Sequence, residues 1–173
     1  MGIDLLEKKF QTYAAACPQN LDRLREIAGQ VSLIQQRMRR LFADITPVLC
    51  SACAAPCCQC MPVEGWFTEC DYMLYRMLYD APFALRIARH DGRSCLFLGA
   101  HGCVLPEDMR PFPCVKVNCR KVSETLAARG LLDEFTRLNS ELEHLQEAVF
   151  PLLADIISDN VLQAQSYDTS FSM

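Results

Sequence analysis

Two long segments of this chain repeat apolar residues at alternating intervals of three and four, which is the pattern that most constrains its fold. The first lies between residues 18 and 45 and carries Leu24, Ile27, Val31, Ile34, Met38, Leu41 and Ile45. The second lies between residues 130 and 158 and carries Leu131, Phe135, Leu138, Leu142, Leu145, Val149, Leu152 and Ile156. This spacing places each set on one face of a helix. We therefore expect an all-α fold, a small helical bundle in which these two long helices pack antiparallel, with a homodimeric coiled coil through one of them as the alternative.

Prolines and changes of period mark the other elements. Pro18 fits the first turn of the first long helix, and Pro151 should kink or break the second near Ala148. A shorter helix is predicted at residues 4–16, with Leu5, Leu6, Lys9 and Tyr13 near one face. Another is predicted at 64–79, with a mostly inward set of Phe67, Met73, Leu74, Met77 and Leu78. Residues 91–120 show neither helical nor strand period, so a long irregular loop is expected there. The prediction is one domain over residues 1–165, with a cysteine-rich module at about 47–120 and a flexible tail at 166–173.

Composition argues for a cytoplasmic protein with free thiol chemistry. At 173 residues and 51% hydrophobic content, the chain is long enough to bury a core without covalent cross-links, so its 11 cysteines are not needed as disulfides. The first residues lack the pattern of a secretory signal, and no apolar run is long enough to span a membrane. The net charge of −4 argues against a nucleic-acid binder, and the arginines at 37, 39 and 40 are interpreted as a solvated helix face.

Nine of the cysteines fall in two short segments that lack regular periodicity. The first segment holds Cys50, Cys53, Cys57, Cys58 and Cys60, and the second holds Cys95, Cys103, Cys114 and Cys119. Thiols two to four residues apart can present several sulfurs to one metal, and a metal would order loops that their own sequences do not. Metal ligation is therefore the leading interpretation; a disulfide framework and a set of buried thiols remain the alternatives.

The charges around the second segment suggest how thiolates would be tolerated. Thiolates are the ligand form, so a site with four or more of them carries net negative charge. Cationic residues lie in and beside the second segment, whereas residues 50–60 carry no charge. We hypothesise that Arg110 or Arg120 donates hydrogen bonds to ligand sulfurs.

The order of these residues resembles the YkgJ-type family of cysteine-cluster proteins. The matching residues are Cys50, Cys53, Cys57 and Cys58, then Cys95-Leu96-Phe97-Leu98, Gly102-Cys103 with Leu105, Arg110-Pro111 with Cys114, and Cys119. The match covers roughly residues 47–120 and departs from the family pattern at Val115, at one extra residue between Cys103 and Arg110, and in the additional Cys60. The resemblance implies a zinc- or iron-chelating domain without implying a reaction. The long flanking helices lie outside it.

Eight cysteines are thus the predicted metal ligands: Cys50, Cys53, Cys57, Cys58, Cys95, Cys103, Cys114 and Cys119. Cys60, Cys70 and His101 are possible additional ligands, and Cys17 is interpreted as structural. Soft thiolates exclude calcium and magnesium and leave zinc, copper(I) or an iron–sulfur cluster; the sequence does not separate zinc from iron–sulfur, although the paired cysteines among prolines resemble iron–sulfur loops.

Three functions are compatible with such a site. The first is a metal-binding protein with a redox or metal-handling role. The second is an adaptor that uses a structural zinc and binds a protein partner, or a second copy, through its heptad helices. The third is a redox or protein-modifying enzyme that works with a partner subunit, although no pairing of a cysteine with a base emerges from the spacing. We therefore identify no catalytic residue.

Overall fold

The computed structural model describes residues 3–54, 57, 68–79, 95, 97–99, 102–103, 105–116 and 119–154. These residues are mostly helical, which confirms the prediction of an all-α fold. The elements in chain order are α1 (Ile3–Ala16), the 3-10 helix η1 (Pro18–Asn20), α2 (Leu21–Phe42), α3 (Thr46–Ser51), α5 (Glu69–Leu78), β1 (Leu98–Gly99), β2 (Gly102–Cys103), α6 (Phe112–Lys116), α7 (Arg120–Ala128), α8 (Leu132–Val149) and the 3-10 helix η2 (Phe150–Leu153).

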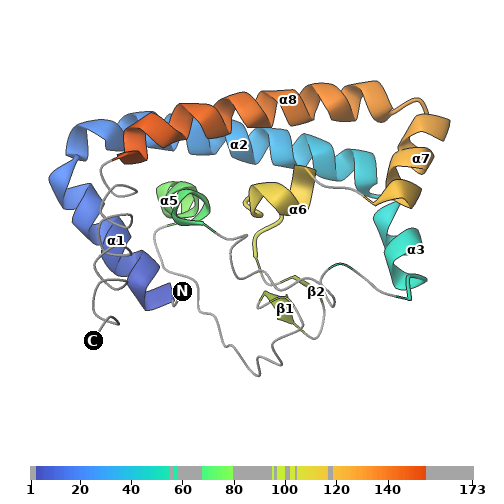
Figure 1. The fold of residues 1–173 in the computed structure, drawn as a ribbon, viewed down its shortest axis with the longest axis horizontal. Helices are drawn as coiled ribbons and strands as arrows, with labels where there is room; N and C mark the ends of the chain where they lie inside the picture. The colour runs from blue at the N-terminus through green and yellow to red at the C-terminus, as the bar shows by residue number, and fades with distance from the viewer. Residues whose placement is uncertain are drawn as a thin grey trace, which may run out of the picture.

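Helices α2 and α8 lie side by side along the length of the molecule and hold the centre of the core (Figure 1). Most of the predicted stripe residues are buried, whereas Leu41, Leu131, Leu145 and Leu152 are half-buried and Ile156 lies outside the described residues. On α2 and just after it, Leu24, Ile27, Val31, Ile34, Met38 and Ile45 are buried, and on α8 Phe135, Leu138, Leu142 and Val149 are buried. Burial of a large aliphatic side chain contributes about 1.5–3 kcal/mol. These two stripes therefore supply a large share of the stability of the fold.

Prolines set the ends of both long helices. The first helical turn at Pro18 is a 3-10 helix that continues directly into α2. The helix ends at Phe42, three residues before the predicted Ile45, and a turn leads into α3, which has Pro47 in its first turn. At the other end of the chain, α8 stops at Val149 and continues as the 3-10 helix that contains Pro151, as predicted. Residues 155–173, including the predicted helical residues after Ala154 and the tail, lie outside the described residues.

Helices α1 and α5 pack against one another, and α5 also packs against α2. The predicted helix at 64–79 is present from Glu69, and the residues before Thr68 in that prediction are not described. One predicted inward position is wrong, because Leu78 is 36% exposed, whereas Met73, Leu74 and Met77 are buried. On α1, Leu6 and Tyr13 are buried but Leu5, which was predicted near the same face, is 47% exposed.

The segment at 91–120 is more regular than its sequence predicted. Within its described residues, β1 and β2 form a short antiparallel hairpin that pairs Leu98 with Cys103 and Gly99 with Gly102. Helix α6 follows Pro111. Strands of two residues and a helix of five are too short to show a period, which is why the pattern did not reveal them.

Helix α7 was also missed, although the sequence contains its stop signal. Gly130 has a φ of 69°, which a residue with a side chain rarely adopts. Its N–H donates to the carbonyl of Ala127, and the N–H of Leu131 donates to the carbonyl of Leu126. This pair of bonds is the Schellman motif, which ends α7 and turns the chain into α8.

Of the helices in the described part of the chain, none has the length and apolar content needed to cross a membrane.

Candidate metal-binding site and its support

The described cysteines of the first segment lie on and just after α3. Cys50 is in the last turn of this helix, and the N–H of Cys53 donates to its carbonyl at 3.2 Å. Cys50, Cys53 and Cys57 are all exposed. Cys58 and Cys60 lie outside the described residues. Three candidate ligands are therefore presented at the surface within eight residues of chain.

The cysteines of the second segment are spread over the hairpin, α6 and the start of α7. Cys95 precedes the hairpin and Cys103 lies on β2, and both are half-buried. Cys114 is on α6 and Cys119 immediately precedes α7, and both are exposed. His101 lies outside the described residues. All seven described candidates are thus accessible to solvent at least in part.

The fold brings the start of the first cysteine segment close to the end of the second at one end of the bundle. Helix α3 contacts α7, so the segment that carries Cys50 lies beside the one that begins after Cys119 (Figure 1). Thr46 and Pro47 of α3 also line a cavity together with Cys114. Among the residues described, however, no three Cys, His, Asp or Glu side chains lie close enough to hold a metal ion.

Cys17 and Cys70 occupy a different environment from the candidate ligands. Cys17 is half-buried and packs against the core, and Cys70 is 5% exposed within it. Burial, followed by the nearby charges of Asp71 and Glu69, raises the pKa of Cys70 to about 12. A thiol in this environment stays protonated, so Cys70 is better described as a small core residue than as a ligand.

Arg110 and Arg120, the two residues proposed to donate hydrogen bonds to ligand sulfurs, lie in different environments. Arg120 is exposed and its Nε lies 2.7 Å from Glu124 Oε1 within α7. Arg110 is half-buried and lines the same cavity as Cys114. Of the two, Arg110 is the one that shares a cavity with a candidate ligand, whereas Arg120 follows Cys119 along the chain.

Asp71 of α5 joins the helical core to the cysteine-bearing segment. Its Oδ2 accepts hydrogen bonds from the N–H of Thr68 at 2.9 Å and from the Thr68 hydroxyl at 2.8 Å. Its Oδ1 accepts the N–H of Phe112 at 3.2 Å, two residues before Cys114. Burial raises the pKa of Asp71 to about 6, and the bonds from Thr68 and Phe112 partly oppose this rise. One carboxylate thus caps α5 and fixes the first residue of α6.

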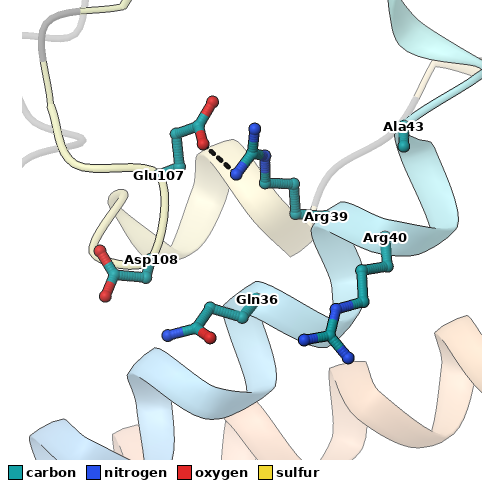
Figure 2. Close-up of a pocket in the computed structure, with 6 residues that line it drawn as sticks. All are labelled: Gln36, Arg39, Arg40, Ala43, Glu107 and Asp108. Carbon is teal, nitrogen blue, oxygen red and sulfur yellow. Dashed lines mark ion pairs between the residues drawn. The ribbon is translucent and has the colours of Figure 1, made fainter.

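Asp108 makes a second connection between this segment and the helices. Its Oδ2 accepts the Ser32 hydroxyl and its Oδ1 accepts the Tyr79 hydroxyl, both at 2.8 Å. Burial alone would raise the pKa of Asp108, but the bonds from Tyr79, Ser32 and Gln36 outweigh it, so the pKa lies below its usual value. Asp108 and Gln36 line a cavity of about 400 Å³, across which Arg39 forms an ion pair with Glu107 (Figure 2).

Gln35 makes the third connection between this segment and the helices. It is the clearest polar residue on the otherwise apolar face of α2. Its side chain is 1% exposed, and it exchanges two hydrogen bonds with the backbone of Arg110. Gln35 Nε2 donates to the Arg110 carbonyl at 2.8 Å, and the Arg110 N–H donates to Gln35 Oε1 at 2.7 Å. A buried amide at this position satisfies both backbone groups of a loop residue.

Replacing Gln35 with alanine should lower the free energy of unfolding by about 2 kcal/mol, because it leaves a backbone donor and acceptor of Arg110 unpaired. The measurement is urea unfolding followed by circular dichroism. Gln30→Ala is the matched control, since Gln30 is an exposed residue of the same helix, and its effect should stay within about 0.5 kcal/mol. Equal effects of the two substitutions would contradict the assignment.

None of these three connections was predicted from the sequence. The Thr68–Asp71 capping box does have a sequence signal, a threonine followed three residues later by an acidic residue before an apolar run. Gln35 and Ser32 could have been noticed as polar residues within the otherwise apolar face of α2. Their partners are 75 and 76 residues away, which no local pattern indicates.

Comparison with known proteins adds no relative, because no family model matches the sequence and neither a curated protein nor a solved structure is significantly similar to it. The resemblance to the YkgJ-type family therefore stays a prediction from the residues themselves.

Proposed function

We propose that this protein binds a metal centre, an iron–sulfur cluster or zinc, through the thiolates of its two cysteine segments, and that the centre has a redox or metal-handling role. The observation that carries the proposal is the division of the described cysteines into two groups. The seven candidate ligands are exposed or half-buried on short elements, whereas Cys17 and Cys70 pack against or within the core. Cysteine is among the most buried residue types when it serves only as a small apolar residue.

The donor set fits a soft metal. Seven cysteine sulfurs that are accessible at least in part match the ligands that zinc and iron–sulfur clusters prefer. Cys50, Cys53, Cys57, Cys95, Cys103, Cys114 and Cys119 would hold the centre, together with the predicted ligand Cys58. An iron–sulfur cluster would supply one-electron transfer, and zinc would supply a fixed cross-link between the segments.

The scaffold supports the proposal at the second segment. Asp71, Gln35 and Asp108 hold residues 108–112 against α2 and α5 through buried or half-buried hydrogen bonds. We take α2 and α8 to be the antiparallel pair expected from the sequence, with the cysteine-rich loops attached at one end. Fixing residues 108–112 limits the freedom of α6 and therefore of Cys114. Ligands that are held in this way lose less entropy when the metal binds.

The ligand thiols must still move closer together to coordinate the metal, because the described side chains do not form a complete ligand set. The binding free energy of a thiolate site is large enough to drive this rearrangement, at about 10–16 kcal/mol for structural zinc in small peptides. Arg110, which lines a cavity with Cys114, is the cation placed to offset the thiolate charge there.

The test is the metal content of the full chain purified without oxygen. Iron with sulfide and visible charge-transfer absorption indicates an iron–sulfur cluster, and colourless protein with stoichiometric zinc indicates the structural alternative. A redox titration of a coloured sample then separates an electron-transfer centre from an inert one. Protein that carries neither metal overturns the proposal.

A further inference from the structure

A second cavity lies between α2, α3 and α6, with a volume of about 330 Å³. This is the size of small-molecule sites in proteins. Much of its lining is apolar and is provided by Met38, Phe42, Ala43, Pro47 and Val115. The polar lining consists of Gln35, Arg39, Thr46, Glu107, Arg110 and Cys114.

Most of the polar groups that line this cavity are already engaged. Gln35 uses both ends of its amide on the Arg110 backbone, and the Thr46 hydroxyl donates to the carbonyl of Phe42. Arg39 and Glu107 form an ion pair with each other, so their charges cancel. These interactions do not involve the side chain of Arg110.

Arg110 is fixed at its backbone and unsatisfied at its side chain. Its Nε is buried and has no hydrogen-bond acceptor among the described residues. A buried donor of a charged group without an acceptor is costly, and native proteins rarely keep one without a role for it. The cavity therefore has one cation to neutralise beside an apolar surface.

We propose that this cavity binds a small organic monocarboxylate, whose carboxylate accepts hydrogen bonds from the Arg110 guanidinium and whose apolar body lies against Met38, Phe42 and Val115. A planar carboxylate matches the fork of donors on a guanidinium. A ligand with one negative charge balances the positive charge of the cavity lining, because the other arginine, Arg39, is already paired with Glu107. The carboxylate would use Arg110 and the apolar lining, but the candidate metal ligand Cys114 lines the same cavity, so carboxylate binding and metal content are measured separately.

Benzoate is the probe, and benzamide is its neutral counterpart of the same shape. We expect the full chain to bind benzoate with a Kd of about 1 mM or tighter, measured by calorimetry or by NMR titration, and to bind benzamide at least about tenfold more weakly. Inorganic phosphate should bind more weakly than benzoate, because it has no apolar part. Equal affinity for benzamide or for phosphate would overturn the proposal, and so would the absence of benzoate binding.

Two variants test the site itself. Arg110→Gln should weaken benzoate binding by about tenfold or more, whereas Arg25→Gln, which removes an exposed and paired arginine at the far end of α2, should leave it unchanged. Ala43→Leu places a larger side chain at the cavity wall and keeps Arg110, so it should also weaken binding. Unchanged affinity in a folded Arg110→Gln or Ala43→Leu variant contradicts the assignment. Metal content measured on the same samples separates failure of this site from failure of the metal proposal.

Discussion

Replacing Asp71 with alanine should lower the free energy of unfolding by about 3 kcal/mol, as measured by urea unfolding at pH 7. The substitution removes the Asp71 half of the capping box of α5 and leaves the N–H of Thr68 without its acceptor, which costs about 1 kcal/mol. It also leaves the N–H of Phe112 unpaired at a residue that is 3% exposed, which costs about 1–3 kcal/mol. Asp133→Ala is the control, because Asp133 is an exposed acidic residue in the first turn of α8 and should change stability by no more than about 0.5 kcal/mol.

The pH dependence of the unfolding free energy shows whether the Asp71 carboxyl is buried or is an ordinary exposed capping group. Because burial raises the folded pKa of Asp71 to about 6, above the value in an unfolded chain, the protonated form is favoured by folding. Its contribution to stability is fully present below the unfolded pKa and is lost as the pH rises through about 6. The difference in unfolding free energy between the natural chain and Asp71→Asn should therefore grow in favour of the natural chain as the pH falls from 7 to 4.

The comparison with Asp71→Asn cancels the titration of other groups, including Asp108, whose lowered pKa acts in the opposite direction. A difference that stays constant with pH would contradict the burial of an ionisable group at this position. An Asp71→Ala variant that loses less than about 1 kcal/mol would contradict its role in holding α6.

Changing Cys50 and Cys53 together to serine should reduce the bound metal of anaerobically purified protein to background. Both residues belong to the predicted ligand set and are exposed, so the change costs little packing. Serine keeps the approximate size but does not provide the soft thiolate that zinc and iron–sulfur centres require. Elemental analysis per chain is the measurement, with circular dichroism to show that the helices persist.

Cys17→Ala provides the matched control for the cysteine pair. It removes a thiol that packs against the core instead of lying in either cysteine segment, so it should keep its metal while losing some stability. If the Cys50 and Cys53 variant retains metal, or if Cys17→Ala loses it while folded, the division of the cysteines into ligands and core residues is wrong.

The helical scaffold could be predicted because its signal is local and repeated. The apolar stripe of α2 and that of α8 each repeat over several turns, and Pro18 before α2 and Pro151 after α8 mark where the helical geometry changes. Helix α7 could have been found from Gly130, whose glycine permits the left-handed turn that ends it. The hairpin and α6 are too short to show a period, and α6 is held by the hydrogen bond of Phe112 to the distant Asp71.

The support of the candidate site could be predicted less well, for a related reason. The cysteine spacing identifies thiol ligands, but the hydrogen bonds that position α6 join residues 41 to 76 positions apart, as in the bonds of Asp71 to Phe112 and of Ser32 to Asp108. Arg110 was singled out from its charge alone. Its fixed backbone and buried Nε, which underlie the proposed carboxylate site, become visible only when α2 and the loop are placed together.

The most direct test of the central claim is the metal content of the full chain, expressed with iron and zinc available and purified without oxygen. The account predicts either iron with sulfide and visible absorption or stoichiometric zinc, in each case lost when Cys50 and Cys53 are replaced and kept when Cys17 is replaced. Folded protein that contains neither metal, or metal that survives replacement of the cysteine pair, would contradict it.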